Sequence, residues 1–210
     1  GAAEGDHIPM LLELFPQIKE LHLYDPRPFR ITSSPKIHIY NEYFDDETAN
    51  GWANRNDVFF ISDIRTADYE TMNEMENEHT ILKDMRDQQR WVKIIQPVQA
   101  HLKFRLPYCD KVDSSLLQVD YLRGHILLQP WVGPTSTEAR LVPYRDPQTN
   151  TFMDMTWDAQ TYEEQLFYHN TVLRNHQLYD NPFLPHDPES PIDPPELSND
   201  WDSLAEVNIL

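Results

Sequence analysis

The fold is decided by the stretch Val58-Phe59-Phe60-Ile61-Ser62-Asp63-Ile64-Arg65. Four consecutive apolar residues of β-branched and aromatic type predict a strand that is buried on both faces, as in a parallel sheet covered by helices. Asp63 then stands at the carboxyl end of this strand, the edge at which open α/β sheets bind ligands. The alternative is an aspartate that caps a helix or forms a turn, and these residues alone leave both roles open.

Composition limits the class of protein. The 210 residues suffice for one domain with appendages, and 40% apolar content provides a core. Cys109 is the single cysteine, so no internal disulfide can form, which suits a reducing compartment. The printed sequence has no bilayer-spanning run and no secretory leader, so we expect a cytoplasmic protein with no membrane partner. A net charge of −18 opposes sequence-independent binding to nucleic acid.

Two glycines, Gly1 and Gly5, precede a predicted helix at residues 8–15. Glycines at this spacing before a helix are typical of a turn whose backbone N–H groups approach a nucleotide. A vector remnant is an equally good alternative at this position. The strand that should precede such a turn is not contained in this chain.

Further strands are predicted at residues 21–25, 37–40, 100–106, 124–131 and 138–143. Asp25 ends the first of them roughly 20 residues after the glycines, the spacing at which a carboxylate meets the ribose hydroxyls of a bound adenosine. Lys103 and Arg105 share one face of their strand with His101, and edge protection is the alternative role for Lys103. The strand at residues 124–131 is predicted to be buried.

Two longer helices are also predicted. One covers residues 69–95, and its acids are expected to form a solvated face rather than a site. These acids include Glu70, Glu74, Glu76 and Glu78. The other helix begins after Asp158, which can serve as its cap.

The order of these elements predicts an α/β fold: a Rossmann-like sheet with helices on both faces, its first strand missing from this chain, that binds an adenosine-containing ligand. Two chemistries are then open, that of a dehydrogenase and that of an S-adenosylmethionine-dependent methyltransferase. Residues 1–178 would form this domain, residues 179–200 a proline-rich acidic wrapper or linker, and residues 201–210 a short C-terminal helix. A dehydrogenase would need a full glycine fingerprint, which is absent. Methyl transfer to a hydroxyl needs a proton acceptor, and Asp63, Lys103 and Glu138 near one sheet edge are the parts required.

These residues resemble a known family in their order and spacing. The similarity is carried by Ile61-Ser62-Asp63-Ile64-Arg65, Leu102-Lys103-Phe104-Arg105, Pro107-Tyr108, Leu128-Gln129-Pro130-Trp131, Glu138-Ala139-Arg140-Leu141, Tyr162-Glu163 and Leu173-Arg174-Asn175. The chain resembles the poxvirus cap-specific mRNA nucleoside 2′-O-methyltransferases, which also serve as the small regulatory subunit of the viral poly(A) polymerase. The resemblance runs from Gly1 to about Asn175, most of the chain.

The resemblance implies a role for each matching residue. Asp63, Lys103 and Glu138 match the last three members of a catalytic Lys-Asp-Lys-Glu tetrad. The implied S-adenosylmethionine site comprises Gly1, Gly5, His7, Asp25, Arg27, Phe44 and Asp63. The 7-methylated cap guanine, a cation that stacks well on an aromatic ring, would meet Tyr108, Asp110 and Glu163. No metal site is expected.

The first lysine of the tetrad, a second stacking aromatic and the central first strand would all lie upstream of Gly1. We therefore expect this chain to be a piece of a longer polypeptide, or to pair with a second chain that completes the sheet. The expected activity is an enzyme that methylates the 2′-hydroxyl of the first transcribed nucleotide of capped mRNA, in the cytoplasm, or in a virion or viral factory if the protein is viral. The alternatives are a non-catalytic cap reader, a regulatory partner of a poly(A) polymerase catalytic subunit, and a methyltransferase for another hydroxyl.

Overall fold

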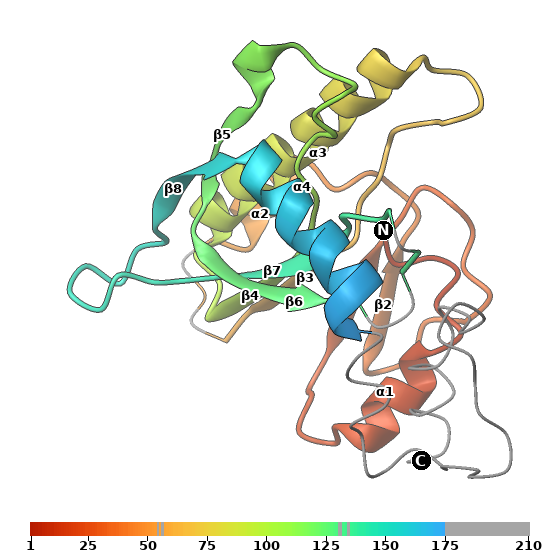
Figure 1. Ribbon diagram of the computed structural model, residues 1–210. Coiled ribbons are helices and arrows are strands. Elements are labelled where there is room, and N and C mark those ends of the chain that lie inside the picture. Colours follow the sequence, from red (N-terminus) through yellow and green to blue (C-terminus); the bar gives the residue numbers. More distant parts are fainter. Residues whose placement is uncertain (54, 56, 130–131, 134, 175–210) are drawn as a thin grey trace, which may run out of the picture.

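The computed structural model describes residues 1–53, 55, 57–129, 132–133 and 135–174. The elements in chain order are α1 (Ile8–Leu14), β1 (Leu21–Tyr24), β2 (Ile37–Tyr40), α2 (Asp46–Gly51), β3 (Phe59–Ser62), α3 (Glu74–Ile95), β4 (Gln99–Phe104), a 3₁₀ turn (Ser114–Leu116), β5 (Gln118–Leu122), β6 (Gly124–Leu128), β7 (Ala139–Pro143), β8 (Asp154–Asp158), α4 (Ala159–Tyr168) and a π-helical turn (His169–Leu173) (Figure 1). The linker and helix expected at residues 179–200 and 201–210 lie outside the described residues. None of the described helices is long and apolar enough to cross a membrane.

The strands form three sheets, so the fold is mixed α/β. A two-stranded parallel sheet pairs β1 with β2, a four-stranded sheet has the order β3-β4-β7-β6, and a two-stranded antiparallel sheet pairs β5 with β8. In the four-stranded sheet β3 and β4 are parallel, whereas β7 runs antiparallel to both β4 and β6. The strands expected near residues 21, 37, 58, 100, 124 and 138 are all present, and α2, β5 and β8 were not predicted.

The two parallel pairs meet at the first residue of the chain. The Gly1 amine donates to the backbone oxygen of Tyr24, at 3.4 Å, just where β1 ends. A Cβ atom on Gly1 would lie 2.7 Å from the backbone oxygen of Asp63, just past the end of β3. Gly1 therefore lies between the carboxyl ends of β1 and β3, two strands that are not paired with each other in the described residues.

Three apolar clusters hold the elements together. In the largest, α3 and α4 pack on β4 and β5, and its fully buried residues include Ile81, Met85, Leu102, Phe104 and Tyr121. The helix α3 begins with a capping box, in which the Asn73 side chain accepts from the Glu76 backbone N–H and the Glu76 side chain accepts from that of Asn73. The helix α4 begins at the predicted cap, where Asp158 accepts from the Thr161 backbone N–H.

The smaller clusters tie the N-terminal third to the rest. Ile8 of α1 packs on Leu23 and Ile37, so α1 covers one face of the β1–β2 sheet. On the opposite face of that sheet, Tyr24 contacts Phe44, which in turn contacts Trp91 of α3. Phe44 therefore links the two parallel pairs through aromatic contacts.

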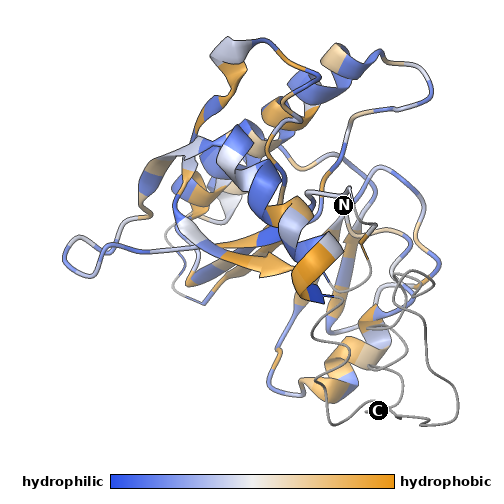
Figure 2. Ribbon diagram, in the orientation of Figure 1, coloured by the Kyte–Doolittle hydropathy of each residue, from blue (hydrophilic) through white to orange (hydrophobic). Residues whose placement is uncertain are grey.

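Burial of β3 and β6 differs from the prediction. Phe59 and Ile61 are 50% and 64% exposed, and only the opposite side of β3, with Phe60, packs toward α3. Leu127 and Leu128 of β6 are also exposed, and Figure 2 shows β6 and α1 as predominantly hydrophobic. The physical reason is that β3 and β6 are the two edges of their sheet, and the described helices cover only one of its faces.

We predict that Leu102→Ala lowers the free energy of unfolding by roughly 2–5 kcal/mol, because it opens a cavity between β4 and α3. The measurement is urea denaturation followed by circular dichroism. Leu127→Ala is the matched control on the exposed face of the same sheet, and we expect a change of at most about 1 kcal/mol. Equal losses for the two variants would contradict the assignment of the buried face.

Candidate functional site

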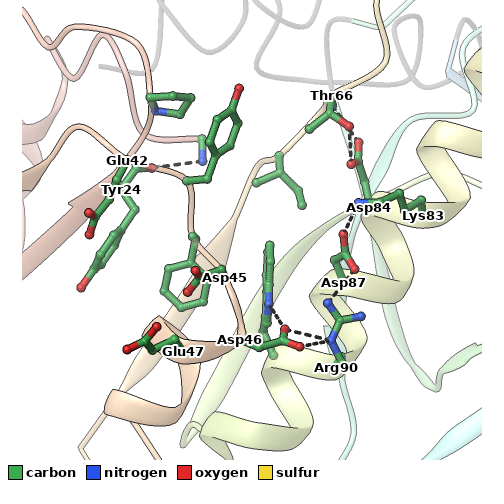
Figure 3. Close-up of a pocket in the computed structure, with 16 residues that line it drawn as sticks. Tyr24, Glu42, Asp45, Asp46, Glu47, Thr66, Lys83, Asp84, Asp87 and Arg90 are labelled. Carbon is green, nitrogen blue, oxygen red and sulfur yellow. Dashed lines mark hydrogen bonds and ion pairs between the residues drawn. The ribbon is translucent and has the colours of Figure 1, made fainter.

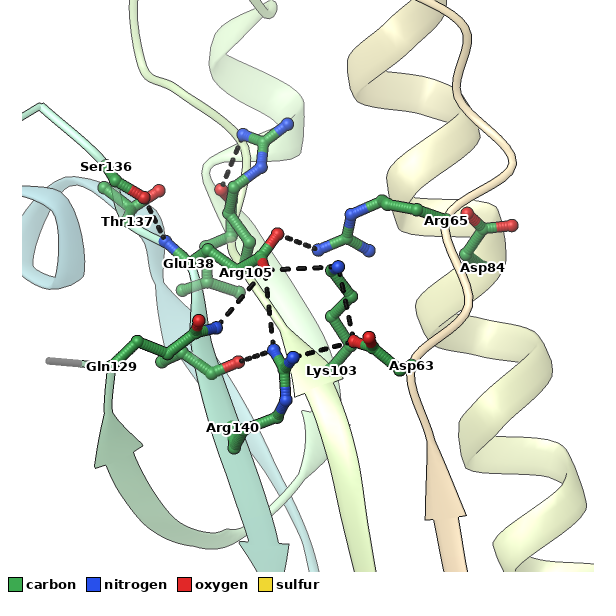
Figure 4. A network of polar contacts seen from close by, with 12 residues as sticks. Asp63, Arg65, Asp84, Lys103, Arg105, Gln129, Ser136, Thr137, Glu138 and Arg140 are labelled. Atoms are coloured by element: carbon green, nitrogen blue, oxygen red, sulfur yellow. Dashed lines mark hydrogen bonds and ion pairs between the residues drawn. The ribbon is translucent and has the colours of Figure 1, made fainter. Parts of the chain in front are cut away.

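The three residues predicted as catalytic come together at the end of β3 and β4 (Figure 4). The Lys103 Nζ atom lies 3.3 Å from Asp63 Oδ1 and 3.2 Å from Glu138 Oε1. Asp63 follows the last residue of β3, and Glu138 precedes the first residue of β7. The side chain of Lys103 is only 15% exposed, so both ion pairs are partly shielded from water.

Two arginines and a glutamine complete this cluster. Arg140 Nη2 lies 2.8 Å from Asp63 Oδ1, and Gln129 Nε2 donates to Glu138 Oε1 at 3.2 Å. Arg65 Nη2 lies 3.6 Å from Glu138 Oε2. The sequence analysis did not single these three out as site residues. A signal was present for the arginines, because Arg65 and Arg140 each stand two positions after a predicted site acid.

The charges of this cluster affect its acid and its buried arginine. Burial favours the neutral form of Glu138, but the positive charges of Lys103 and Arg65, with hydrogen bonds from Lys103 and Gln129, outweigh it and lower the pKa of Glu138. Burial lowers the pKa of Arg65. Among the described residues no hydrogen-bond acceptor reaches the three guanidinium nitrogens of Arg65. These nitrogens have almost no contact with solvent, so the positive charge of Arg65 acts within the cluster, on Glu138.

A pocket of about 500 Å³ adjoins this cluster (Figure 3). Its lining includes Gly1, Tyr24, Phe44, Ile64 and Trp91, so it begins one residue beyond Asp63 and lies beside the aromatic contact that links the two sheets. The lining also carries six acids, Glu42, Asp45, Asp46, Glu47, Asp84 and Asp87. Lys83 and Arg90 also line the pocket and pair with Asp87 and Asp46, so only part of the negative charge remains free. The remaining acids and the aromatic walls suit a ligand that combines a flat ring with positive charge.

Asp25 lies between two residues that line this pocket, Tyr24 and Pro26. Burial favours its neutral form, but hydrogen bonds from the Arg27 side chain and backbone and from the Ala3 backbone lower the pKa of Asp25 to about 2. Each carboxylate oxygen accepts one backbone N–H, from Arg27 or Ala3, and one guanidinium N–H of Arg27. The Arg27 side chain is 66% exposed. If the Arg27 side chain moved away, each oxygen would regain one lone pair.

The other residues predicted to bind the cofactor are less closely grouped. Gly1 and Phe44 line the pocket, but Gly5 and His7 do not. Gly5 has φ +85°, a conformation that favours glycine, and its carbonyl accepts from the Ile8 backbone N–H at the start of α1. His7 is the exposed N-cap residue of α1.

The residues predicted to bind the cap, Tyr108, Asp110 and Glu163, lie near one another where the segment after β4 meets α4. Glu163 of α4 accepts from the Cys109 backbone N–H at 2.8 Å, which places it beside Tyr108 and Asp110. The Tyr108 hydroxyl donates to the Thr135 carbonyl at 3.2 Å. Asp110 is exposed and lies 3.4 Å from the Lys111 amine. The structure thus brings the three residues to one region, and their role stays a prediction.

A buried ion pair between Arg105 and Glu78 lies next to Tyr108. It shows that the predictions for Arg105 and for Glu78 were wrong. Arg105 does not share the wetted face of β4, because it follows the strand and forms a two-pronged ion pair with Glu78 of α3 at 2.9 Å for each bond. Glu78 is accordingly buried rather than solvated, whereas Glu70, Glu74 and Glu76 are exposed. Arg105 also lies over the Tyr108 ring at 4.5 Å, and Glu78 accepts from the Tyr108 backbone N–H. The pair therefore fixes the position of Tyr108.

The fold and the site together define a mixed α/β protein with a lysine between two acids beside an acid-rich, aromatic-walled pocket. The family model described as poly A polymerase regulatory subunit matches residues 1–189. The chain belongs to this family.

One curated relative and one solved structure are similar to this chain. The cap-specific mRNA (nucleoside-2′-O-)-methyltransferase of fowlpox virus (strain NVSL) is 27% identical over 186 residues, which cover 83% of this chain and 58% of the relative. The chain thus spans little more than half the length of this relative. The fold is also similar to that of bluetongue virus VP4, described as a multifunctional RNA-capping production line, with a TM-score of 0.58 and 15% identity. That match covers 80% of this chain and 27% of VP4.

We predict that Arg105→Met lowers the free energy of unfolding by roughly 3–5 kcal/mol, because it leaves the Glu78 carboxylate buried without its partner. Urea denaturation measures the loss. Lys83→Met is the control, since Lys83 forms an exposed ion pair with Asp87, and we expect a loss of at most about 1 kcal/mol. The double variant Glu78→Leu with Arg105→Met should recover part of the stability, and no recovery would contradict our account of the pair.

Proposed function

We propose that this chain carries the catalytic part of a methyltransferase that transfers a methyl group from S-adenosylmethionine to the ribose 2′-hydroxyl of the first transcribed nucleotide of capped mRNA. The observation that carries the proposal is the position of Lys103 Nζ, between Asp63 at 3.3 Å and Glu138 at 3.2 Å, next to the pocket. A held amine at this place can take the proton of a hydroxyl that attacks a methyl carbon.

Each member of the cluster has a distinct role in this proposal. S-adenosylmethionine supplies an electrophilic methyl group, whose bond to sulfur breaks as the bond to the 2′-oxygen forms. Lys103, in its neutral amine form, would accept the proton released from the hydroxyl and become the ammonium that pairs with Asp63 and Glu138. Asp63 orients the amine, and Glu138, held by Gln129 and Arg65, supports it from the other side.

The hydrogen-bonding capacity of Asp25 and the aromatic residues that line the nearby pocket support a binding site for S-adenosylmethionine. Asp25 would exchange the guanidinium of Arg27 for the two ribose hydroxyls, and the adenine would lie against Phe44. S-adenosylmethionine carries a sulfonium charge, which the acids around the pocket favour. The 7-methylguanine of the cap is also a cation, and it would stack on Tyr108 near the carboxylates of Asp110 and Glu163. We place this activity in the cytoplasm.

The second candidate function is a regulatory subunit of poly(A) polymerase that binds capped ends without catalysis. The description of the matching family favours it. In that case a polymerase catalytic subunit is the partner, and the Lys103 cluster is retained for structure. The two functions differ in whether removal of the Lys103 amine changes chemistry or only stability.

We predict that Lys103→Ala lowers methyl transfer by about 10²- to 10⁴-fold, because the reaction loses its proton acceptor. Transfer of labelled methyl to a short capped RNA measures the effect, with the longest polypeptide encoded by the gene. Cofactor affinity, measured by calorimetry, should change little. Lys93→Ala is the matched control, since Lys93 is exposed on α3 and pairs with Asp154 rather than with a residue of the cluster.

The substrate controls separate the alternatives. A capped RNA that already carries a 2′-O-methyl on its first nucleotide should accept no label. Label in both RNAs, or transfer unaffected by Tyr108→Ala, would indicate another hydroxyl. Wild-type turnover by Lys103→Ala would contradict the catalytic role, and capped-end binding without any transfer by the wild-type protein would support the regulatory subunit.

The proposal also includes an extended segment that completes the sheet between β1 and β3. The facing edges of these strands carry unpaired backbone groups in the described residues, and Gly1 already bonds to the end of β1. Unpaired edges are a template for another strand. We propose that the occupant runs parallel to both and is joined to Gly1 or supplied by a second chain.

We predict that the amides of β1 and β3 that point away from β2 and β4 exchange slowly with deuterium only when this segment is present, because its pairing satisfies these backbone groups. The test compares the 210-residue chain with a polypeptide that also carries any residues its gene encodes before Gly1. Amides of β5 and β8, which form a separate sheet, serve as the internal control. Equal protection of β1 and β3 in both polypeptides would contradict the proposed pairing.

A further inference from the structure

The amino-terminal half of the β1–β2 sheet carries a group of polar side chains that the proposed function does not use. His22 of β1 and His38 of β2 are direct partners in the parallel register. Their rings stack with centroids 4.5 Å apart and an angle of 20° between the planes. Glu20 stands just before β1, and its Oε2 atom lies 3.1 Å from His22 Nε2 and 3.9 Å from His38 Nε2.

One of these nitrogens has no partner. His38 Nε2 is buried and makes no hydrogen bond to any described residue, because its 3.9 Å separation from Glu20 is too long for one. A buried polar atom left without a partner costs free energy and calls for an explanation. The unpaired nitrogen faces the same carboxylate oxygen as the neighbouring histidine, so the two imidazoles and the carboxylate converge.

Surrounding residues hold this arrangement in place. The Nδ1 atom of His22 lies 3.2 Å from the Tyr40 hydroxyl, and the Trp52 ring packs edge-on against the His22 ring at 4.6 Å. A second ring nitrogen held by a hydrogen bond is the usual support of a histidine that binds a metal, because it fixes the tautomer and the orientation of the ring.

We propose that Glu20, His22 and His38 form a binding site for Zn²⁺ or a transition-metal ion of similar character. One candidate ligand atom from each residue lies within 4.8 Å of the others. Two imidazoles and one carboxylate are a typical zinc set, and they disfavour Mg²⁺ and Ca²⁺, which prefer oxygen ligands. Bonds of roughly 2.0–2.2 Å to the ion require the rings to rotate and the donors to close by about 1 Å, which the 56% exposed Glu20 side chain permits.

The position of the site suggests what the ion does. A parallel sheet of two strands has little stability of its own, and the ion would join both strands to the residue that precedes them. His22 and His38 neighbour Tyr24 and Tyr40 along the same face, and Tyr24 lines the pocket described above. The ion would therefore stabilise one wall of the pocket without taking part in chemistry.

Two measurements on the tag-free protein test the proposal. Zn²⁺ binding is measured by titration calorimetry, and Co²⁺ binding is followed by its absorption spectrum. We expect one equivalent to bind, a higher midpoint of thermal unfolding with Zn²⁺ but not with Mg²⁺, and reversal by a chelator. His38→Ala should weaken binding by about tenfold or more. His38→Cys should retain it, because a thiolate is also a zinc ligand.

The control variant is His79→Ala, since His79 is exposed on α3 and lies outside the cluster. It should bind Zn²⁺ as the wild type does, and circular dichroism verifies that each variant is folded. Equal affinity for the wild type and a folded His22→Ala, His38→Ala double variant would overturn the proposal, because binding would then come from other histidines among the nine. The absence of Zn²⁺-dependent stabilisation in the wild type would overturn it as well.

Discussion

The register between β3 and β4 is the constraint on which the site depends. Ser62 is the partner of Leu102, so the next residue of each strand, Asp63 and Lys103, emerge side by side at the same edge of the sheet. On the other side of β4, the antiparallel strand β7 pairs Arg140 with Lys103. This register brings Glu138, which precedes β7, into contact with the Lys103 amine. A slip of one residue in either pairing would turn these side chains to opposite faces and separate the charges.

The long helix α3 holds the connections that follow these strands. Its Asp84 accepts from both the backbone and the hydroxyl of Thr66, which anchors the segment after β3. One turn and a half earlier, Glu78 anchors Arg105, which follows β4. Both acids are buried, so each must be paired, and each pairing fixes a loop that leaves the edge of the sheet. The acids in and near α3, which were predicted to form one solvated face, therefore fall into two groups. Glu70, Glu74 and Glu76 are exposed, whereas the buried Glu78 and Asp84 hold neighbouring loops in place.

The sequence alone predicted most of the described strands, and it placed Asp63 and Glu138 at the ends of two of them. Local patterns predicted β1 to β4, β6, β7 and the cap of α4, because a short apolar run and a capping aspartate act within a few residues. They did not predict β5 and β8. The pairing of Glu78 with Arg105, and of His22 with His38, depends on contacts between distant segments, and no local pattern indicates them. Exposure of β3 was missed for the same reason, since a buried strand and an edge strand can have the same apolar run.

The net charge of −18 is compatible with the proposed RNA substrate, because salt screens the repulsion between distant exposed charges. Lys103, Arg65 and Arg140 meet in one partly buried cluster, where fewer water molecules screen them than on the open surface. The acids elsewhere repel a long phosphate backbone, so binding would be limited to the few nucleotides that reach this cluster. Such a distribution favours the end of a strand over its interior, as a cation that stacks on Tyr108 can add affinity only at a capped end.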